Sequence, residues 1–251
     1  MNKQPVTTEG ASIGRHADER STASAVQSMF AAVAPRYDLL NHLLSLGFDV
    51  LWRRETARAL KPVLEKPSSL VADLCCGTGD LALALRRVSS GRVVGTDFCH
   101  SMVQRARQKA APLKNPLFVL DADTLRLPFA DDSLNAVTIA FGFRNLANYR
   151  KGLEEMRRVL RTGGVVAILE FSHVQWPVFG PLFRAYFRHV LPRLGAWISG
   201  VQGPYQYLPD SVSRFPDQEA LACALREVGF TNVRYRNFTG GVAALHLGEK
   251  V

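Results

Sequence analysis

Two glycines and two carboxylates are spaced for binding a nucleotide-like ligand. The stretch Asp73-Leu-Cys-Cys-Gly-Thr-Gly-Asp80 follows an apolar run and opens a helical pattern. Glycines at 77 and 79 would let the backbone pass close to a ligand, and the helix that follows would offer free N–H groups. Asp97 ends the next apolar run, where a carboxylate can accept hydrogen bonds from both ribose hydroxyls. The pattern therefore predicts a nucleotide site.

Strand and helix patterns alternate around this loop. The strand patterns are five runs whose apolar residues are continuous rather than alternating, at 70–75, 92–97, 117–120, 136–141 and 165–171. Such runs are typical of parallel strands covered on both faces. Two further strands, 232–238 and 242–247, are separated only by a Thr-Gly-Gly turn and predict a hairpin. We expect an α/β, Rossmann-like fold: a mostly parallel seven-stranded sheet with a C-terminal antiparallel hairpin and helices on both faces.

Two cofactors could use this frame. The Gly-x-Gly-x-x-Ala sequence that begins at Gly77 satisfies the dinucleotide fingerprint of NAD enzymes, which alone is a weak signal. S-adenosylmethionine (SAM) fits better. Asp73 can receive the ammonium group of a methionine tail. Asp121 or Asp123, after the third strand, can accept a hydrogen bond from an adenine amino group. The terminal hairpin is typical of SAM methyltransferases and not of dehydrogenases.

Composition excludes several classes of protein. The 251 residues, 47% hydrophobic and 21% charged, suffice for a complete core. No apolar run approaches the roughly 20 residues that cross a bilayer, and the first residues of the sequence show no apolar core of the kind found in signal peptides. We therefore expect a cytoplasmic protein. The four cysteines and six histidines show no metal-ligand spacing, so no metal is expected. The net charge of +9 would attract nucleic acid, an anionic membrane face or an acidic substrate.

The end of the fourth strand indicates which kind of atom receives the methyl group. It reads Ala140-Phe-Gly-Phe-Arg-Asn145. Methyltransferases that act on exocyclic amino groups of bases carry an Asn/Asp-Pro-Pro-aromatic clamp here, and methylation of a pyrimidine C5 needs a cysteine nucleophile. The sequence has neither at this place, so nucleic acid loses its most direct support as a partner.

Eight short sequences, in order along the chain, match a known family. They are Pro35-Arg-Tyr-Asp-Leu-Leu-Asn41, Trp52-Arg53, the loop at 73–80, Phe141-Gly-Phe-Arg-Asn145, Leu169-Glu-Phe-Ser172, His189-Val-Leu-Pro192, Pro216-Asp-Gln218 and Gly240-Gly-Val-Ala-Ala-Leu-His246. Over nearly all of residues 25–251 the chain resembles the ubiquinone/menaquinone biosynthesis C-methyltransferases, the UbiE/MenG family. Many members have Gly-Gly-Thr-Gly where this chain has Cys75 and Cys76 before its Gly-Thr-Gly, although a Cys-Cys variant is familiar among photosynthetic relatives.

The resemblance implies a class I fold and transfer of a methyl group from SAM to a ring carbon of a polyprenylated hydroquinone. It also implies cofactor contacts at Thr78, Asp97, Asp123 and Thr124. Many members have serine at the position of Ala140, so that only backbone can contact the cofactor there. With the residues of the loop, the expected cofactor-binding set is Asp73, Gly77, Thr78, Gly79, Asp97, Asp123, Thr124 and Ala140.

Methylation of a ring carbon needs an electron-rich ring, hence a hydroquinone and preferably its phenolate. A phenol with a pKa of about 10 is mostly protonated at neutral pH. Arg144 can stabilise the phenolate, but its own pKa is too high for it to be the base. The base stays open between a water held by Asn145 and the side chains of Tyr37, Glu170 and His173. A second interpretation makes Arg144 the partner in a structural ion pair.

An apolar helical segment interrupts the alternation between residues 172 and 216. Its aromatic side chains, flanked by arginines, could line a channel for a prenyl chain and contact anionic headgroups. A core helix of a capping element is an equally good interpretation. We divide the chain into a flexible lead-in (1–21) and one SAM-dependent methyltransferase domain (22–251). That domain has an N-terminal helical cap (22–66) and a substrate-side insertion (172–216).

The expected function is SAM-dependent C-methylation of a polyprenylated hydroquinone in respiratory quinone biosynthesis. Demethylmenaquinol is the preferred substrate by analogy, because the Cys-Cys variant resembles that of naphthoquinone makers. The alternatives are the equivalent step in ubiquinone or phylloquinone biosynthesis, an RNA methyltransferase, and a non-catalytic SAM- or NAD-binding protein. The expected partners are the prenylated hydroquinone and, transiently, the inner face of a membrane, with no nucleic acid. A homodimer is left open.

Overall fold

The computed structural model describes residues 10, 19–34, 38, 42, 45–176 and 203–251. Several sequence predictions lie outside these residues, among them those for Tyr37 and for the apolar stretch that precedes residue 203.

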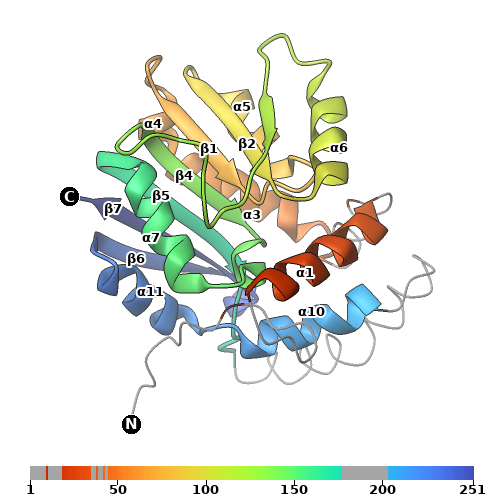
Figure 1. Ribbon diagram of the computed structural model, residues 1–251. Coiled ribbons are helices and arrows are strands. Elements are labelled where there is room, and N and C mark those ends of the chain that lie inside the picture. The colour runs from red at the N-terminus through yellow and green to blue at the C-terminus, as the bar shows by residue number, and fades with distance from the viewer. Residues whose placement is uncertain (1–9, 11–18, 35–37, 39–41, 43–44, 177–202) are drawn as a thin grey trace.

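Seven strands form one twisted sheet in the order β3-β2-β1-β4-β5-β7-β6 (Figure 1). They are β1 (Leu70–Leu74), β2 (Arg92–Asp97), β3 (Phe118–Asp121), β4 (Leu134–Ala140), β5 (Leu160–Phe171), β6 (Phe230–Phe238) and β7 (Ala243–Lys250). Strands β1 to β5 pair in parallel, and β7 pairs antiparallel with both β5 and β6. The short turn η4 (Thr239–Gly241) closes the hairpin at the predicted residues. The predicted fold class is confirmed.

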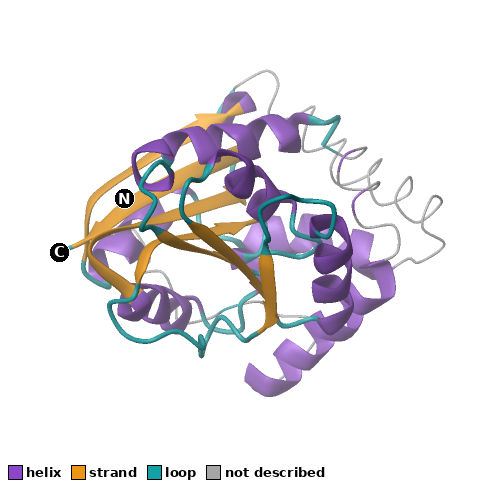
Figure 2. Cartoon of the chain, turned by 90° about the horizontal axis from the view of Figure 1, so that it is seen from above, coloured by secondary structure: helices purple, strands orange, loops and turns teal. Residues whose placement is uncertain are grey.

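Helices cover both faces of the sheet, as the view from above shows (Figure 2). One face packs against α3 (Phe48–Ala59), α4 (Lys61–Leu64), α5 (Asp80–Val88) and α6 (His100–Ala110). The other packs against α7 (Tyr149–Val159) and α11 (Gln218–Glu227). Neighbouring strand residues such as Val71 and Ala72 are both fully buried, one in each core, which explains why apolar residues in the strands follow one another without alternation. No described helix is long and apolar enough to cross a bilayer.

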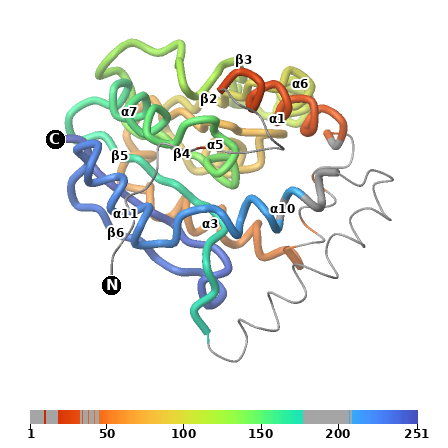
Figure 3. Tube along the Cα trace, turned by 60° about the horizontal axis from the view of Figure 1, so that its bottom comes forward, coloured from red at the N-terminus to blue at the C-terminus, as the bar shows by residue number. Residues whose placement is uncertain are grey.

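The helix α1 (Glu19–Val33) contacts α6 and α10 (Gly203–Arg214), near the carboxyl ends of the central strands (Figure 1, Figure 3). It begins at Glu19, three residues before the helical pattern that the sequence shows from residue 22. The Glu19 carboxylate accepts hydrogen bonds from Lys151 Nζ and Asn148 Nδ2, each at 2.9 Å. These contacts with distant residues hold the first turn of α1, and local sequence pattern cannot reveal them.

A buried histidine in the hairpin makes stability depend on pH. His246 is 2% exposed, and its Nε2 donates to the Gln218 carbonyl at 2.8 Å. Burial lowers its pKa to about 4, whereas the unfolded chain takes up this proton near about 6.5. The stabilisation is therefore complete above pH 6.5 and is lost as the pH falls towards 4.

We expect this group to remove about 2 kcal/mol from the free energy of unfolding between pH 7 and pH 5. Urea unfolding at both pH values measures the effect. The His246→Gln variant, whose amide can still donate to the Gln218 carbonyl, should lack this part of the loss. His100→Gln, at an exposed histidine, is the control and should behave like the wild type. An unchanged pH dependence in His246→Gln would contradict the assignment.

Candidate active site

A cavity of about 360 Å³ lies where the loops after β1, β2, β3 and β4 meet. In open α/β sheets, ligands bind outside the carboxyl ends of the strands, as here. The loops contribute Cys75, Gly77, Asp97, Phe98, Cys99, Asp123, Thr124, Leu125, Phe141, Gly142 and Asn145. The helix α1 closes one side with Ala23, Val26 and Phe30. The spacing of apolar residues in this segment predicts a helix, but it does not predict that the helix lines the cavity.

Asp97 joins the first two of these loops. Its Oδ2 accepts from the Gly77 N–H at 2.8 Å, and its Oδ1 accepts from the Cys99 N–H at 2.9 Å. Burial raises the pKa of Asp97, and the backbone N–H groups of Cys99 and Gly77 oppose that rise. Gly79 caps α5 in the left-handed conformation, with φ 89°, which glycine adopts at no steric cost. The loop is therefore fixed, and Asp97 still faces the cavity.

Two residues other than glycine adopt the left-handed conformation beside the cavity. Cys75, which follows β1, has φ 46°, and Phe141, which follows β4, has φ 58°. The two loops touch: a Cβ added to Gly142 would lie 2.5 Å from Cys75 Cβ. The chain thus needs glycine at position 142 for the loops to approach this closely.

Asp73 carries a buried carboxylate oxygen that lacks a partner. The residue is 1% exposed, and its Oδ1 accepts from Thr138 Oγ1 at 2.7 Å. Its Oδ2 has no hydrogen-bond partner within the described part of the chain. Burial raises the pKa of Asp73 to about 7, against the opposing effects of the Thr138 hydrogen bond, the Arg53 charge and the backbone N–H of Ala82. A buried carboxylate oxygen of this kind fits a cationic group of a ligand, such as the ammonium of SAM.

If Asp73 receives an ammonium group, binding of SAM must depend on pH. Only the carboxylate form of Asp73 attracts the cation. Because its pKa is about 7, about half of the ligand-free molecules carry a protonated Asp73 at pH 7. We expect the dissociation constant, measured by calorimetry, to be about fivefold higher at pH 6 than at pH 7. Asp73→Asn should bind SAM weakly at both pH values. Asp121→Asn is the matched control, and the same pH dependence in Asp73→Asn as in the wild type would refute the role.

The two carboxylates after β3 have different surroundings. Asp123 lines the cavity, although its Oδ1 also accepts from the Leu125 N–H at 2.9 Å. Thr124 is buried beside it, with Oγ1 at 3.3 Å from Cys75 Sγ. Asp121 is exposed, and its Oδ1 lies 2.7 Å from His100 Nδ1. The structure thus brings Asp123 and Thr124 to the cavity, and not Asp121.

Four members of the predicted cofactor-binding set are not among the residues that line the cavity: Asp73, Thr78, Gly79 and Ala140. The Thr78 hydroxyl donates to the carboxylate of Asp38, which also accepts from Lys109 Nζ at 2.9 Å. Sequence reasoning missed Asp38 and Lys109, because they meet at Thr78 from positions far apart in the sequence. Their contacts hold the Asp38 carboxylate beside the Thr78 hydroxyl.

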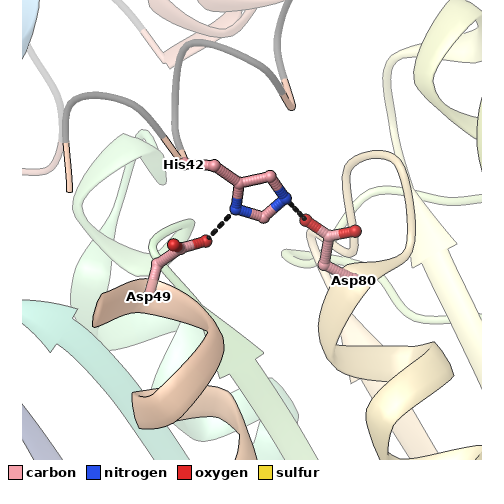
Figure 4. Close-up of side chains that lie close together, drawn as sticks. All are labelled: His42, Asp49 and Asp80. Atoms are coloured by element: carbon pink, nitrogen blue, oxygen red, sulfur yellow. Dashed lines mark hydrogen bonds and ion pairs between the residues drawn. The ribbon is translucent and has the colours of Figure 1, made fainter. Parts of the chain in front are cut away.

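His42, Asp49 and Asp80 extend this charged network (Figure 4). His42 Nδ1 lies 2.8 Å from Asp49 Oδ2, and His42 Nε2 lies 3.8 Å from Asp80 Oδ2. These residue types can ligate a metal ion. However, the guanidinium of Arg53 pairs with Asp49 and lies 3.9 Å from Asp80. A side-chain cation thus already balances the carboxylates, and the group acts as an ion-pair network.

Arg144 forms a buried ion pair with Glu170. Both side chains are buried, and Arg144 Nη1 lies 2.7 Å from Glu170 Oε1. The same Nη1 donates to the Phe141 carbonyl at 2.6 Å, and the guanidinium lies 5.4 Å from the centre of the Phe171 ring. Neither Arg144 nor Glu170 is among the residues that line the cavity. This geometry favours the second interpretation of Arg144, the structural ion pair.

Asn145 reaches the cavity from the turn η2 (Phe143–Asn145). Its Oδ1 accepts from the Tyr207 hydroxyl at 3.0 Å, and its Nδ2 lies 3.4 Å from the Phe141 carbonyl. Burial raises the pKa of Tyr207, so the phenol stays protonated and donates. Tyr207 was missed, because nothing in the 172–216 pattern distinguishes it. His173, by contrast, is exposed, and its Nε2 donates to the Phe215 carbonyl at 3.0 Å.

The fold is that of the class I SAM-dependent methyltransferases, enzymes for which SAM is the methyl donor. Solved structures with the same fold include a SAM-dependent methyltransferase from Thermotoga maritima, with TM-score 0.64 and 17% identity over 90% of this chain and 100% of that chain. Another is the [4+2]-cyclase SpnF, with TM-score 0.67 and 16% identity over 91% of this chain and 96% of that chain. At these identities the likeness shows the fold alone.

The chain belongs to the ubiE/COQ5 methyltransferase family, whose model matches residues 16–250. This confirms the resemblance seen in the sequence. A demethylmenaquinone methyltransferase of Deinococcus radiodurans is 48% identical over 234 residues, which cover 93% of this chain and 95% of that protein. The Thermus thermophilus protein of the same name is 50% identical over 223 residues, 88% of this chain and 100% of the relative. That of Staphylococcus aureus strain Newman is 39% identical over 236 residues, 93% and 96% of the two chains.

Proposed function

We propose that this protein transfers the methyl group of SAM to a ring carbon of demethylmenaquinol and so forms menaquinol. The observation that carries the proposal is the close likeness, over nearly the whole chain, to relatives named demethylmenaquinone methyltransferases. The unpartnered buried oxygen of Asp73 supports SAM as the ligand. Methylation in ubiquinone or phylloquinone biosynthesis, and methylation of RNA, have no such support.

We propose that four side chains divide the work of holding SAM, which supplies an electrophilic methyl group when bound. Asp73 receives the ammonium, and Asp97 accepts from the ribose hydroxyls. Asp123 and Thr124 lie at the adenine end, because they line the cavity after β3. The remaining members of the predicted set act by backbone or by shape: Gly77, Thr78, Gly79 and Ala140.

On the substrate side we propose that Asn145 contacts the hydroquinone and that Arg144 is a positioning residue. Tyr207 donates to Asn145 Oδ1, so one amide N–H of Asn145 stays available to a substrate oxygen or a water. A water held there takes up the phenol proton, and the ring carbon that gains the methyl group releases its own hydrogen as a proton to solvent when the ring regains aromaticity. Arg144 acts through its ion pair with Glu170, which fixes η2. Since the methyl donor is already reactive, alignment of the ring supplies most of the acceleration.

The remaining base candidates are poorer fits. The Glu170 carboxylate already accepts three hydrogen bonds, from Arg144 Nη1, from the Arg144 backbone N–H and from the Phe171 backbone N–H. The Nε2 of His173 is engaged by a backbone carbonyl. Tyr37 lies outside the described residues and stays a prediction.

We also propose a cytoplasmic location with peripheral, transient contact at the inner face of a membrane, where a prenylated substrate resides. The division into a lead-in and one methyltransferase domain with a helical cap and a substrate-side insertion is part of this proposal, with the first boundary moved to Glu19. A homodimer stays a prediction from the sequence.

A methyl-transfer assay with labelled SAM tests the function. Demethylmenaquinone and a ubiquinone precursor that lacks the ring methyl group are each supplied with and without reductant. We expect labelled product from reduced demethylmenaquinone and none from the oxidised form, because only the hydroquinone has an electron-rich ring. A preference for the ubiquinone precursor would move the protein to that pathway. Binding of SAM without transfer to either ring would favour RNA as the substrate.

A further inference from the structure

The start of α3 exposes a group of apolar side chains, which we call the apolar tip. Leu46 is 75% exposed, Leu51 49%, Phe48 42% and Val50 37%. Isolated apolar side chains on a surface need no explanation, but four within six consecutive residues form a patch of the kind that binds a partner.

A basic groove of about 710 Å³ adjoins the apolar tip, between α3 and α5. Six basic side chains line it, against the two acidic ones of Glu65 and Asp80: Arg53, Arg54, Arg58, Lys61, Arg87 and Lys109. Val50 belongs to both the tip and the groove, so the two surfaces are continuous. No carboxylate pairs with Arg54 or Arg87 anywhere in the described ranges. These two cations are therefore available to an anion.

Aromatic rings connect the apolar tip with the cavity. The ring of Phe48 stacks on Trp52 with centroids 6.2 Å apart, and Trp52 lies 6.0 Å from the ring of Phe141. Phe141 lines the cavity. Ring contacts through the buried Trp52 thus link the apolar tip to Phe141, which lines the candidate active site.

We propose that the apolar tip and the basic groove together dock this protein on an anionic membrane surface. The tip enters the interfacial layer, and Arg54 and Arg87 face the lipid phosphates. Charge complementarity and the apolar tip select this occupant, because a dissolved phosphate or an RNA would leave four apolar side chains in water. The proposal rests on the proposed function, since it places the candidate active site beside the phase that holds a prenylated hydroquinone.

Vesicle sedimentation tests the docking surface. The full chain is mixed with phosphatidylglycerol/phosphatidylcholine vesicles and with phosphatidylcholine vesicles. We expect binding to the first only, and less of it at high salt. Arg54→Gln/Arg87→Gln should weaken binding at least tenfold, as should Leu46→Ser/Leu51→Ser. The matched controls are Lys114→Gln/Arg161→Gln for charge and Phe118→Ser/Leu120→Ser for exposed apolar side chains of the edge strand β3. Both should bind as the wild type does.

Equal losses in the controls and the test variants would overturn the proposal, as would unchanged binding in both test variants. Unchanged binding in Leu46→Ser/Leu51→Ser together with loss in Arg54→Gln/Arg87→Gln would point to an anion site without membrane insertion, and would also overturn it. Methyl transfer to a water-soluble, short-chain demethylmenaquinol separates the two proposals. All variants should retain it if only docking is affected, whereas no transfer by the wild type would count against the proposed function alone.

Discussion

Replacing Asp97 by alanine will weaken SAM binding by at least about 100-fold, because hydrogen bonds to a charged acceptor contribute about 1.5–3 kcal/mol each and the ribose can make two. The variant also loses the acceptor that fixes the Gly77 and Cys99 N–H groups. Titration calorimetry with SAM measures the effect directly. Circular dichroism of the variant shows whether the sheet is retained.

Asp121→Ala is the matched control for this prediction, because Asp121 also ends a strand of the same sheet but is exposed beside His100. It should bind SAM within about twofold of the wild type, since exposed ion pairs contribute little. A loss of affinity that is the same in both variants would show that Asp97 has no specific contact with the ligand.

Replacing Arg144 by alanine will lower the free energy of unfolding by about 3–5 kcal/mol, since Glu170 would be left as a buried, uncompensated charge. Both side chains are buried, and the Phe141 carbonyl would lose the nearer of its two donors, keeping only Asn145 Nδ2 at 3.4 Å. Urea unfolding measures the change. At low temperature, where the variant is folded, SAM affinity should be nearly retained and turnover should fall, because Asn145 is no longer held.

A second variant separates the charge from the packing. Arg144→Met/Glu170→Gln removes both charges and should recover most of the lost stability but not the turnover. Arg150→Ala, which breaks the exposed pair with Glu154, should change stability by less than about 1 kcal/mol. Full stability in Arg144→Ala would show that the ion pair is not structural, and would return Arg144 to a direct role on the phenolate.

The strands of the sheet could be predicted from the sequence alone, because apolar runs and turn residues are local patterns. The strand predicted over 92–97 matches β2 (Arg92–Asp97), and the Thr-Gly-Gly turn closes the hairpin as expected. Strands with apolar residues on both sides need helices on both faces of the sheet, and this narrows the fold to the α/β class. The start of α1 could not be predicted, since Glu19 is held by Lys151 and Asn148, far along the chain.

The candidate site divides in the same way. Asp73, Gly77 and Asp97 follow from a loop motif whose spacing carries its own geometry. The partners of Asn145 and Thr78, which are Tyr207 and Asp38, depend on contacts between segments more than 35 residues apart. The role of Arg144 depended on whether a carboxylate met it, and only the structure places Glu170 there.

Because Cys75 and Phe141 have a left-handed backbone, the conformational entropy of these two positions is lost when the chain folds and not when a ligand binds. A residue with a side chain resists this conformation by about 1–2 kcal/mol, so the surrounding packing has to impose it as the chain folds. Because these two positions have already lost their freedom, an arriving ligand does not have to order them. The binding free energy then reflects the contacts between ligand and loops, because no further conformational entropy of these two positions is lost on binding.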